Sequence, residues 1–207
     1  MTLKKLFYIS LLTLVAIIGM LVIIYFILPE IYQPSYFKFM GFTILLLGYA
    51  VIIIDIIFLL PTVHGAIYLP SSNINIKRFI QLAQPQKNQK AVDIGAGDGR
   101  VVVALAQAGL EAHGYEINPL LVAWSRLKYR NSPVKDKLHF HFASMWNVNY
   151  SQFNIVTIFG MSYIMKDLEK KLFSELKPGA RVICISFPFP TWKVSKKIGR
   201  VYLYEKK

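Results

Sequence analysis

Two long apolar segments open the chain, before polar and apolar residues begin to alternate. Residues 6–28 contain no charged side chain, and a second apolar segment runs over residues 39–60 and stops at Pro61. A helix as long as the first segment, rising about 1.5 Å per residue, spans the roughly 30 Å of a bilayer core. The pattern therefore predicts an N-terminal transmembrane hairpin, with helices at about residues 6–28 and 39–60.

Basic residues give this hairpin an orientation. Lys4 and Lys5 precede the first segment, and Lys77 and Arg78 follow the second. Since positive residues prefer the cytoplasmic side, both termini and the domain beyond the hairpin are predicted to be cytoplasmic. The start also resembles a signal peptide, but the apolar run is too long for one and no small-residue cleavage site follows. Asp55 is an ionisable residue within the second segment, where it has either a function or a partner at the headgroups or on a neighbouring helix.

Beyond the hairpin, the pattern changes to alternating strands and helices. Residues 61–89 are predicted to be a connector followed by a helix over residues 74–84 that covers the sheet edge or a cofactor mouth. The remaining residues, 90–207, are predicted to form an α/β, doubly wound sheet with an antiparallel final strand. The predicted strands are residues 90–93, 112–116, 138–143, 155–159 and 181–187, with helices at 100–108, 119–130 and 165–176 and a last strand pair within 191–205.

A glycine-rich turn follows the first of these strands. The segment Val-Asp-Ile-Gly-Ala-Gly-Asp-Gly-Arg at residues 92–100 places glycines at every second position, whereas a dinucleotide fingerprint needs a glycine where Arg100 stands. This spacing argues against NAD. Asp93 is expected to be ionised and to provide a counter-charge for an ammonium or sulfonium group. The candidate cofactor residues of the turn are Asp93, Gly95, Ala96, Gly97 and Gly99.

The turn is similar to motif I of class I S-adenosylmethionine-dependent methyltransferases, which implies a Rossmann-like sheet and S-adenosylmethionine as cofactor. Glu116 ends the second strand, where its two carboxylate oxygens can accept hydrogen bonds from both ribose hydroxyls. Ser144 and Met145 follow the third strand and are expected near the adenine. Many enzymes of this class have Asp at the position of Ser144.

Aromatic residues follow the fourth and fifth strands and suggest a substrate pocket. The Asn- or Asp-Pro-Pro-aromatic motif of amino-methylating DNA enzymes is absent here, so no nucleic-acid partner is expected. An aromatic wall can orient a cationic or methylated amine. For Phe189, packing against the final strands is the favoured alternative. The pocket candidates are Tyr68, Phe159, Tyr163, Phe187, Pro188 and Trp192, of which the two tyrosines are also possible orienters, and no general base is identified.

Metal and disulfide chemistry are not expected. His139 and His141 lie two residues apart on one strand, without a third ligand at metal spacing, so no metal site is assigned. Cys184 is the single cysteine, which excludes an internal disulfide and suits a reducing compartment.

Composition and charge agree with a membrane location. The chain is 55% hydrophobic and only 17% charged, which is too apolar for an ordinary soluble domain. Its formal net charge is +13, and nearly all of this excess lies beyond residue 60. A basic surface suits nucleic acid or an anionic membrane, and the adjoining apolar segments favour the membrane bilayer as partner.

Several segments together resemble the mitochondrial lysine N-methyltransferases of the ATP synthase c-subunit and of the adenine nucleotide translocase. The resemblance extends over roughly residues 66–205 and implies a protein-lysine methyltransferase that acts on a membrane protein near the bilayer surface. By this resemblance, the residues expected to bind the cofactor include Asp93, Gly95, Gly97 and Glu116. The segments are residues 68–71, 92–100, 114–119, 158–160 and 187–192.

Two other functions remain open on the sequence alone. The hairpin and the apolar residues around the predicted pocket also suit a methyltransferase whose quinone or lipid substrate enters from the bilayer. The altered adenine position also allows a membrane module that binds the cofactor without catalysis.

Overall fold

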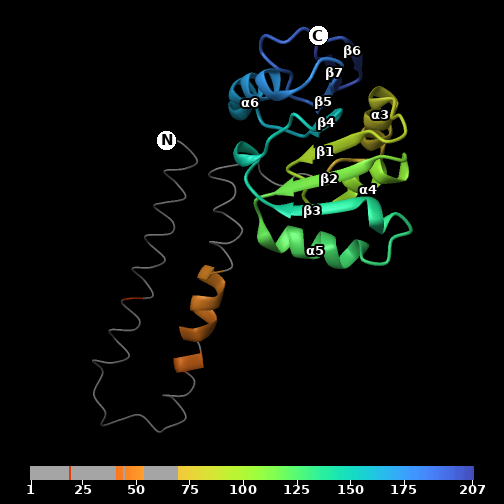
Figure 1. The fold of residues 1–207 in the computed structure, drawn as a ribbon. Helices are drawn as coiled ribbons and strands as arrows, with labels where there is room; N and C mark the ends of the chain where they lie inside the picture. The colour runs from red at the N-terminus through yellow and green to blue at the C-terminus, as the bar shows by residue number, and fades with distance from the viewer. Residues whose placement is uncertain (1–18, 20–40, 44, 54–69) are drawn as a thin grey trace, which may run out of the picture. The chain divides into compact units, whose positions relative to one another are not determined.

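A computed structural model describes residues 19, 41–43, 45–53 and 70–207 (Figure 1). The chain divides into two compact units, Met1–Val63 and His64–Lys207. In the first unit the described residues are helical, and six large apolar side chains among residues 41–43 and 45–53 are exposed. Within the described stretches, no helix has both the length and the apolar character needed to cross a membrane. Most of the predicted hairpin, including Asp55, lies outside the described residues, as does Tyr68.

The second unit contains one seven-stranded sheet in the order β3-β2-β1-β4-β5-β7-β6 (Figure 1). Strands β1 to β5 are parallel, and β7 pairs antiparallel with both β5 and β6. The predicted α/β class and its antiparallel end are therefore confirmed. The strands are β1 (Lys90–Ile94), β2 (Glu111–Glu116), β3 (Leu138–Phe142), β4 (Ile155–Ile158), β5 (Arg181–Ile185), β6 (Lys196–Ile198) and β7 (Val201–Glu205).

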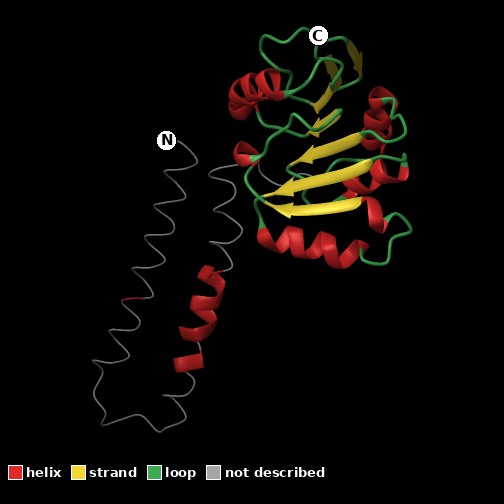
Figure 2. Ribbon diagram, viewed as in Figure 1, coloured by secondary structure: helices red, strands yellow, loops and turns green. Residues whose placement is uncertain are grey.

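Helices cover both faces of the sheet (Figure 2). On one face the apolar side chains of α3 and α4 pack on alternate residues of the central strands, such as Ala91 and Ile155, while α6 packs on residues of the other face, such as Val92 and Val156. This alternation follows from the two-residue period of a strand that is buried on both sides. The elements are α3 (Asn73–Ala83), α4 (Arg100–Gln107), α5 (Pro119–Tyr129) and α6 (Ser162–Glu175), with short 3-10 turns η2 (Lys135–Lys137) and η3 (Met145–Asn147).

Element ends differ from the predicted ones where local turns intervene. Strand β5 stops two residues earlier than predicted, because Ser186 turns the chain in the left-handed region with φ 67°. Helix α6 begins at Ser162 rather than at residue 165. Helix α3 packs on β5, β7 and α4, so it covers part of a sheet face and not the sheet edge.

Candidate functional site

Strands β1 and β4 lie side by side at the point where the strand order reverses. From β1 the chain continues to β2 and β3 on one side, and from β4 it continues to β5 on the other. In such sheets ligands bind outside the carboxyl ends of the strands at this switch point. The glycine-rich turn leaves β1 at this edge, where the arrowheads of β1, β2 and β3 also end (Figure 2). The fold therefore places the expected ligand site at this edge.

Asp93 is a buried carboxyl group at the end of β1. Its side chain lies in register with Thr157 of β4, whose hydroxyl group donates a hydrogen bond to Asp93 Oδ1 at 2.7 Å. Burial raises the pKa of Asp93 to about 8, with smaller contributions from the nearby carboxyls of Glu116 and Asp98. The expectation that Asp93 is ionised at neutral pH is thus corrected, because the protein around it favours the neutral acid. A cation bound next to Asp93 would restore the ionised form.

Thr157 suits both protonation states of Asp93. Its hydroxyl group lies 2.7 Å from Asp93 Oδ1 and 3.3 Å from the Val92 carbonyl oxygen. A hydroxyl group both donates and accepts, so it can donate to the ionised carboxylate or accept from the neutral acid while donating to Val92. The pair can therefore lose or take up a proton without leaving a buried polar atom unpaired.

The glycine-rich turn exposes main chain at this edge. Gly95 has φ 73°, and a Cβ atom placed there would meet no heavy atom within 4 Å. The N–H groups of Gly95 and Ala96 donate to the Tyr115 carbonyl oxygen at 2.9 and 3.1 Å, which fixes the turn to β2. The backbone at Gly95 is therefore held in place and is open to close approach by a ligand.

Gly99 closes the turn and begins α4. It has φ 81°, and a Cβ atom at this position would lie 2.7 Å from Phe140. Both the backbone conformation and the adjacent ring therefore require glycine at residue 99.

Glu116 connects the end of β2 to the same turn. Its Oε2 accepts a hydrogen bond from the Gly97 N–H at 2.9 Å, and its Oε1 accepts one from the Asn118 N–H at 2.8 Å. A carboxylate has about four acceptor positions, so two remain for ligand hydroxyl groups. The structure thus brings Glu116 next to the turn, and its expected hydrogen bonds to ribose hydroxyls remain a prediction.

Ser144 and Met145 follow β3 at the same edge. The Ser144 hydroxyl group accepts a hydrogen bond from the Trp146 N–H at 3.4 Å and caps η3. The Met145 carbonyl oxygen accepts one from the Tyr150 hydroxyl group at 2.9 Å. Because the Ser144 side chain serves the local turn, its expected contact with adenine remains a prediction.

The remaining pocket candidates differ in their exposure. Phe159 and Phe187 follow the neighbouring strands β4 and β5, and both are partly buried against the two cores. Tyr163 lies in the first turn of α6 with 61% of its surface exposed, and Pro188 is also exposed. These four residues stay at the carboxyl edge or close to it, which is compatible with a pocket.

Trp192 lies elsewhere, which removes it from the predicted pocket. Its indole N–H donates to the Glu205 carbonyl oxygen at 3.4 Å, and its ring contacts Phe173 edge to face at 5.3 Å. Glu205 pairs with Arg181, the first residue of β5, so Trp192 packs at the amino end of that strand. Phe189 stacks on Trp192 and is only 4% exposed, which confirms the packing role favoured for it.

Two residues that support the site were missed in the sequence. Thr157 is the single polar residue of β4, and its pairing with Asp93 follows from the parallel register. The buried Ser125 donates from its hydroxyl group to the Gly97 carbonyl oxygen at 3.0 Å, from a position in α5 that no local pattern connects to the turn. Of these two residues, only Thr157 could have been identified from the sequence, because it is a polar residue within an apolar strand.

Asp98 holds the turn on its other side. Burial opposes its charge, but hydrogen bonds from Arg100 and Lys128 lower the pKa of Asp98 to about 2. Its carboxylate thus stays ionised and joins the turn to α5. This residue anchors the turn, whereas Asp93 has no cationic hydrogen-bond partner among the described residues.

Comparisons with known proteins give matches to one group of enzymes. The family model described as the ANTKMT methyltransferase domain matches residues 93–196. The ATP synthase C-subunit lysine N-methyltransferase of Rattus norvegicus is 40% identical over 132 residues, which are 64% of this chain and 61% of that protein. The adenine nucleotide translocase lysine N-methyltransferase of Mus musculus is 35% identical over 143 residues, 67% of this chain and 62% of that protein. The chain thus spans about three fifths of the length of these relatives.

A solved structure is also similar to this chain. An RNA methyltransferase from Salinibacter ruber in complex with S-adenosyl-L-homocysteine matches with a TM-score of 0.64 and 25% sequence identity. The match covers 66% of this chain and 93% of that protein.

Proposed function

The chain belongs to the family of the ANTKMT methyltransferase domain, and from this premise we propose that it is an S-adenosylmethionine-dependent protein-lysine N-methyltransferase. The matched region contains the glycine-rich turn, Glu116 and the residues around β4 and β5. The observation that carries the proposal is the position of two carboxyl groups, Asp93 and Glu116, on either side of an open turn at the switch point of the sheet. The relatives named as lysine N-methyltransferases support the choice of lysine as acceptor.

The residues of this edge fit S-adenosylmethionine. The open backbone at Gly95 permits close approach, Asp93 can pair with a positive group, and Glu116 has acceptor positions for hydroxyl groups. When bound there, S-adenosylmethionine would supply a methyl group on a positively charged sulfur. The tasks of the protein are then to hold this group, to align the lysine amine and to exclude water.

Positioning is expected to provide most of the rate acceleration. Bound S-adenosylmethionine would supply its methyl group directly to the amine, so no covalent intermediate with the enzyme would be needed. The lysine must first lose a proton, and an apolar environment favours the neutral amine because it disfavours the ammonium form. We infer that Phe159 and Phe187 create this environment and that Tyr163 orients the amine; their positions after β4 and β5 and in the first turn of α6 support this inference.

We further infer that the N-terminal unit holds the enzyme at a membrane, with both termini and the methyltransferase unit in the cytoplasm. The apolar segments at residues 6–28 and 39–60 support this inference, as do the large apolar side chains exposed along the described helix. The basic excess of the second unit suits an anionic leaflet. The substrate would then be a lysine of a membrane protein near the bilayer surface.

Methyl-transfer assays on membranes test the acceptor. The purified protein is incubated with membrane vesicles and S-adenosylmethionine labelled in its methyl group, and label is measured in the protein and lipid fractions. We expect label in methyl-lysine of a membrane protein, and none with Asp93→Asn. Label in lipid or quinone would replace the lysine assignment with a lipid-soluble substrate. Binding of S-adenosylhomocysteine without transfer of label would indicate a module without catalysis.

Removal of residues 1–60 tests the membrane inference. The shortened protein should bind S-adenosylhomocysteine as tightly as the full chain, because the second unit is compact by itself. It should methylate a membrane-embedded substrate more slowly, while a soluble peptide with the same lysine serves as control. Equal rates on the embedded substrate would show that the N-terminal unit does not locate the enzyme.

A further inference from the structure

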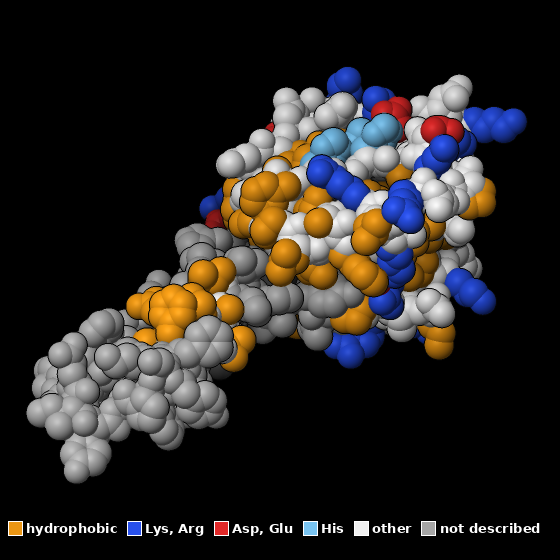
Figure 3. Space-filling model, turned by 90° about the horizontal axis from the view of Figure 1, so that it is seen from below, with side chains coloured by type: hydrophobic (Ala, Val, Ile, Leu, Met, Phe, Trp, Pro, Cys, Tyr) orange, Lys and Arg blue, Asp and Glu red, His pale blue; other side chains and the backbone are white. Residues whose placement is uncertain are grey.

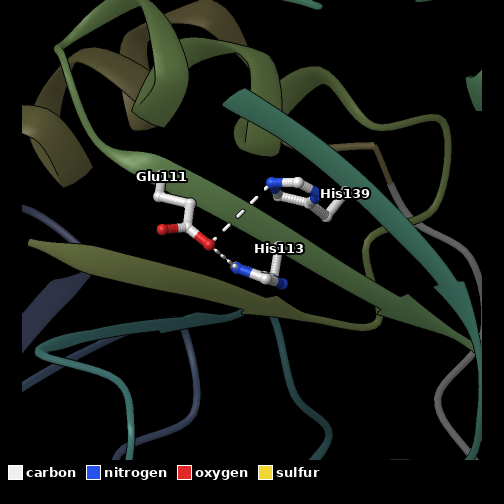
Figure 4. Close-up of side chains that lie close together, drawn as sticks. All are labelled: Glu111, His113 and His139. Carbon is white, nitrogen blue, oxygen red and sulfur yellow. Dashed lines mark hydrogen bonds and ion pairs between the residues drawn. The ribbon is translucent and has the colours of Figure 1, made fainter. Parts of the chain in front are cut away.

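A second cluster of polar side chains lies on β2 and β3, away from the switch point. Glu111 and His113 come from β2 and His139 from β3 (Figure 4). His113 and His139 are partners in the parallel register, and Glu111 precedes His113 by two residues, so all three side chains share one face of the sheet. This face is opposite to the one on which α4 packs. The cluster lies in the amino-terminal half of the two strands, whereas Glu116 lies at the carboxyl end of β2.

The three side chains converge on one point. His113 Nε2 lies 3.1 Å from Glu111 Oε1, and His139 Nε2 lies 3.9 Å from the same oxygen (Figure 4). One donor atom from each residue lies within 4.8 Å of the other two. A tetrahedral zinc ion with bonds of about 2.0 to 2.2 Å separates its ligand atoms by roughly 3.3 to 3.5 Å. Small side-chain rotations would therefore bring these atoms to ligand distance.

The surroundings favour metal-ligating imidazoles. A metal ion binds a neutral imidazole through a ring nitrogen that carries no proton. His141 Nε2 lies 3.1 Å from His113 Nδ1, so it can accept the Nδ1 proton and leave Nε2 of His113 for a metal. This is the orientation that outer hydrogen bonds give to metal-binding histidines.

The cluster is also accessible from solvent. The side chains of Glu111 and His139 are 40% and 39% exposed. The described histidines gather at the surface beside acidic and basic side chains (Figure 3). A hydrated ion can therefore reach the cluster without opening the sheet.

From this geometry we propose that Glu111, His113 and His139 bind a divalent transition-metal ion of the zinc type. Two imidazoles and one carboxylate form a recognised ligand set for such ions, and a fourth position is left for water. The ion would join β2 to the edge strand β3 at a distance from the cofactor edge. His139 and His141 alone are a poor metal pair, but the register adds His113 and Glu111, which lie more than twenty residues earlier in the chain.

Lys90 is the built-in competitor for this site. Its Nζ lies 3.0 Å from Glu111 Oε1, the oxygen toward which both imidazoles point. A bound metal ion must displace this ammonium group. Lys90→Met should therefore tighten metal binding several-fold, because it removes a competing cation and keeps an aliphatic side chain in its place.

Calorimetry with the purified full chain tests the proposal. The protein is treated with a chelator and titrated with ZnCl2, and separately with MgCl2. We expect one zinc ion to bind per chain and magnesium to bind far more weakly, since imidazole ligands favour zinc. Loss of an outer-shell partner typically costs about tenfold to 100-fold in metal affinity, so Glu111→Gln, His113→Asn and His139→Gln should each weaken binding at least about tenfold.

Glu205→Gln is the matched control. This exposed glutamate lies on β7, which is near the opposite end of the strand order from β2 and β3. It should leave zinc affinity unchanged. Far-UV circular dichroism establishes folding for each variant, and the exposed Glu111 and His139 can be replaced with little effect on the core. The absence of zinc binding to the chelator-treated protein would overturn the proposal. Zinc binding that neither Glu111→Gln nor His139→Gln weakens would also overturn it.

Discussion

Asp93→Asn should make the stability of the second unit less sensitive to pH, and it should weaken binding of S-adenosylhomocysteine. In the folded protein the pKa of Asp93 is about 8, raised by burial, whereas a carboxyl group in an unfolded chain titrates near 3.9. Between these values the folded state holds a proton that the unfolded state has released. The folded state binds more protons, so stability falls as pH rises through this window.

The size of the effect follows from the difference in pKa. Each unit corresponds to about 1.4 kcal/mol, so Asp93 should lower the free energy of unfolding by ~5 kcal/mol between about pH 4 and pH 8. Between pH 5 and pH 8 the contribution is ~4 kcal/mol on the same basis. Asparagine has nearly the same shape and does not titrate. The free energy of unfolding of the variant minus that of the wild type should therefore increase by this amount between pH 5 and pH 8.

Urea unfolding followed by tryptophan fluorescence measures this difference. The three tryptophans, Trp124, Trp146 and Trp192, all lie in the second unit, so the signal reports that unit alone. The wild type and Asp93→Asn are compared in the same detergent buffer at pH 5, 6, 7 and 8. Subtracting the free energy of unfolding of the wild type from that of the variant at each pH cancels the contributions of the histidines, which are the same in both proteins. Asp167→Asn changes an exposed aspartate and should follow the wild type at every pH.

Parallel stability curves for the wild type and Asp93→Asn would refute this reasoning. They would mean that Asp93 titrates alike in the folded and unfolded states. A variant with reduced pH dependence but unchanged affinity for S-adenosylhomocysteine would keep the electrostatic account of Asp93 and remove the residue from the cofactor site.

Three further substitutions test the parts of the site separately. Thr157→Val removes the hydroxyl donor to Asp93, so it should lower the free energy of unfolding in urea by about 1 to 3 kcal/mol and raise the pKa of Asp93 further. Unchanged stability would show that this hydrogen bond does not stabilise the fold. Glu116→Ala should weaken S-adenosylhomocysteine binding in calorimetry by about 1 to 3 kcal/mol, and an equal affinity would exclude Glu116 from the site. Gly99→Ala should lower the unfolding free energy by at least about 1 to 2 kcal/mol, because it combines a left-handed backbone with a contact to Phe140, and a wild-type melting temperature would contradict this.

The sequence predicts the framework of the second unit well, because its signals are local. These signals depend on only a few neighbouring residues. They are apolar runs of strand length, helix caps such as Asn118 before Pro119, and the turn residues Gly99 and Gly109. Asn118 accepts hydrogen bonds from the first N–H groups of α5 as its position implies. The predicted cofactor residues at the ends of β1 and β2 follow from the same local pattern combined with the rule for parallel sheets.

Features that depend on neighbouring strands could not be predicted in this way. Trp192, in the aromatic run after β5, was predicted to line the pocket, but the chain turns at Ser186 and Trp192 lies at the amino end of the strand. The histidines of β3 likewise gain partners only through the register with β2. A single sequence gives the direction in which a side chain leaves its strand, but not the strand that lies beside it.

The buried acids of this unit show why Asp93 is the residue to associate with a ligand. Asp98 is 6% exposed, yet Arg100 and Lys128 neutralise it and keep its pKa low. Glu169, also 6% exposed, accepts hydrogen bonds from the N–H and hydroxyl groups of Thr191. Within the described part of the chain, the side chain of Asp93 has only a hydroxyl partner, and its burial costs stability at neutral pH. The structural acids Asp98 and Glu169 are paired with donors within the fold. Asp93 lies beside an open turn and its burial lowers stability, and a positively charged ligand would complete its environment.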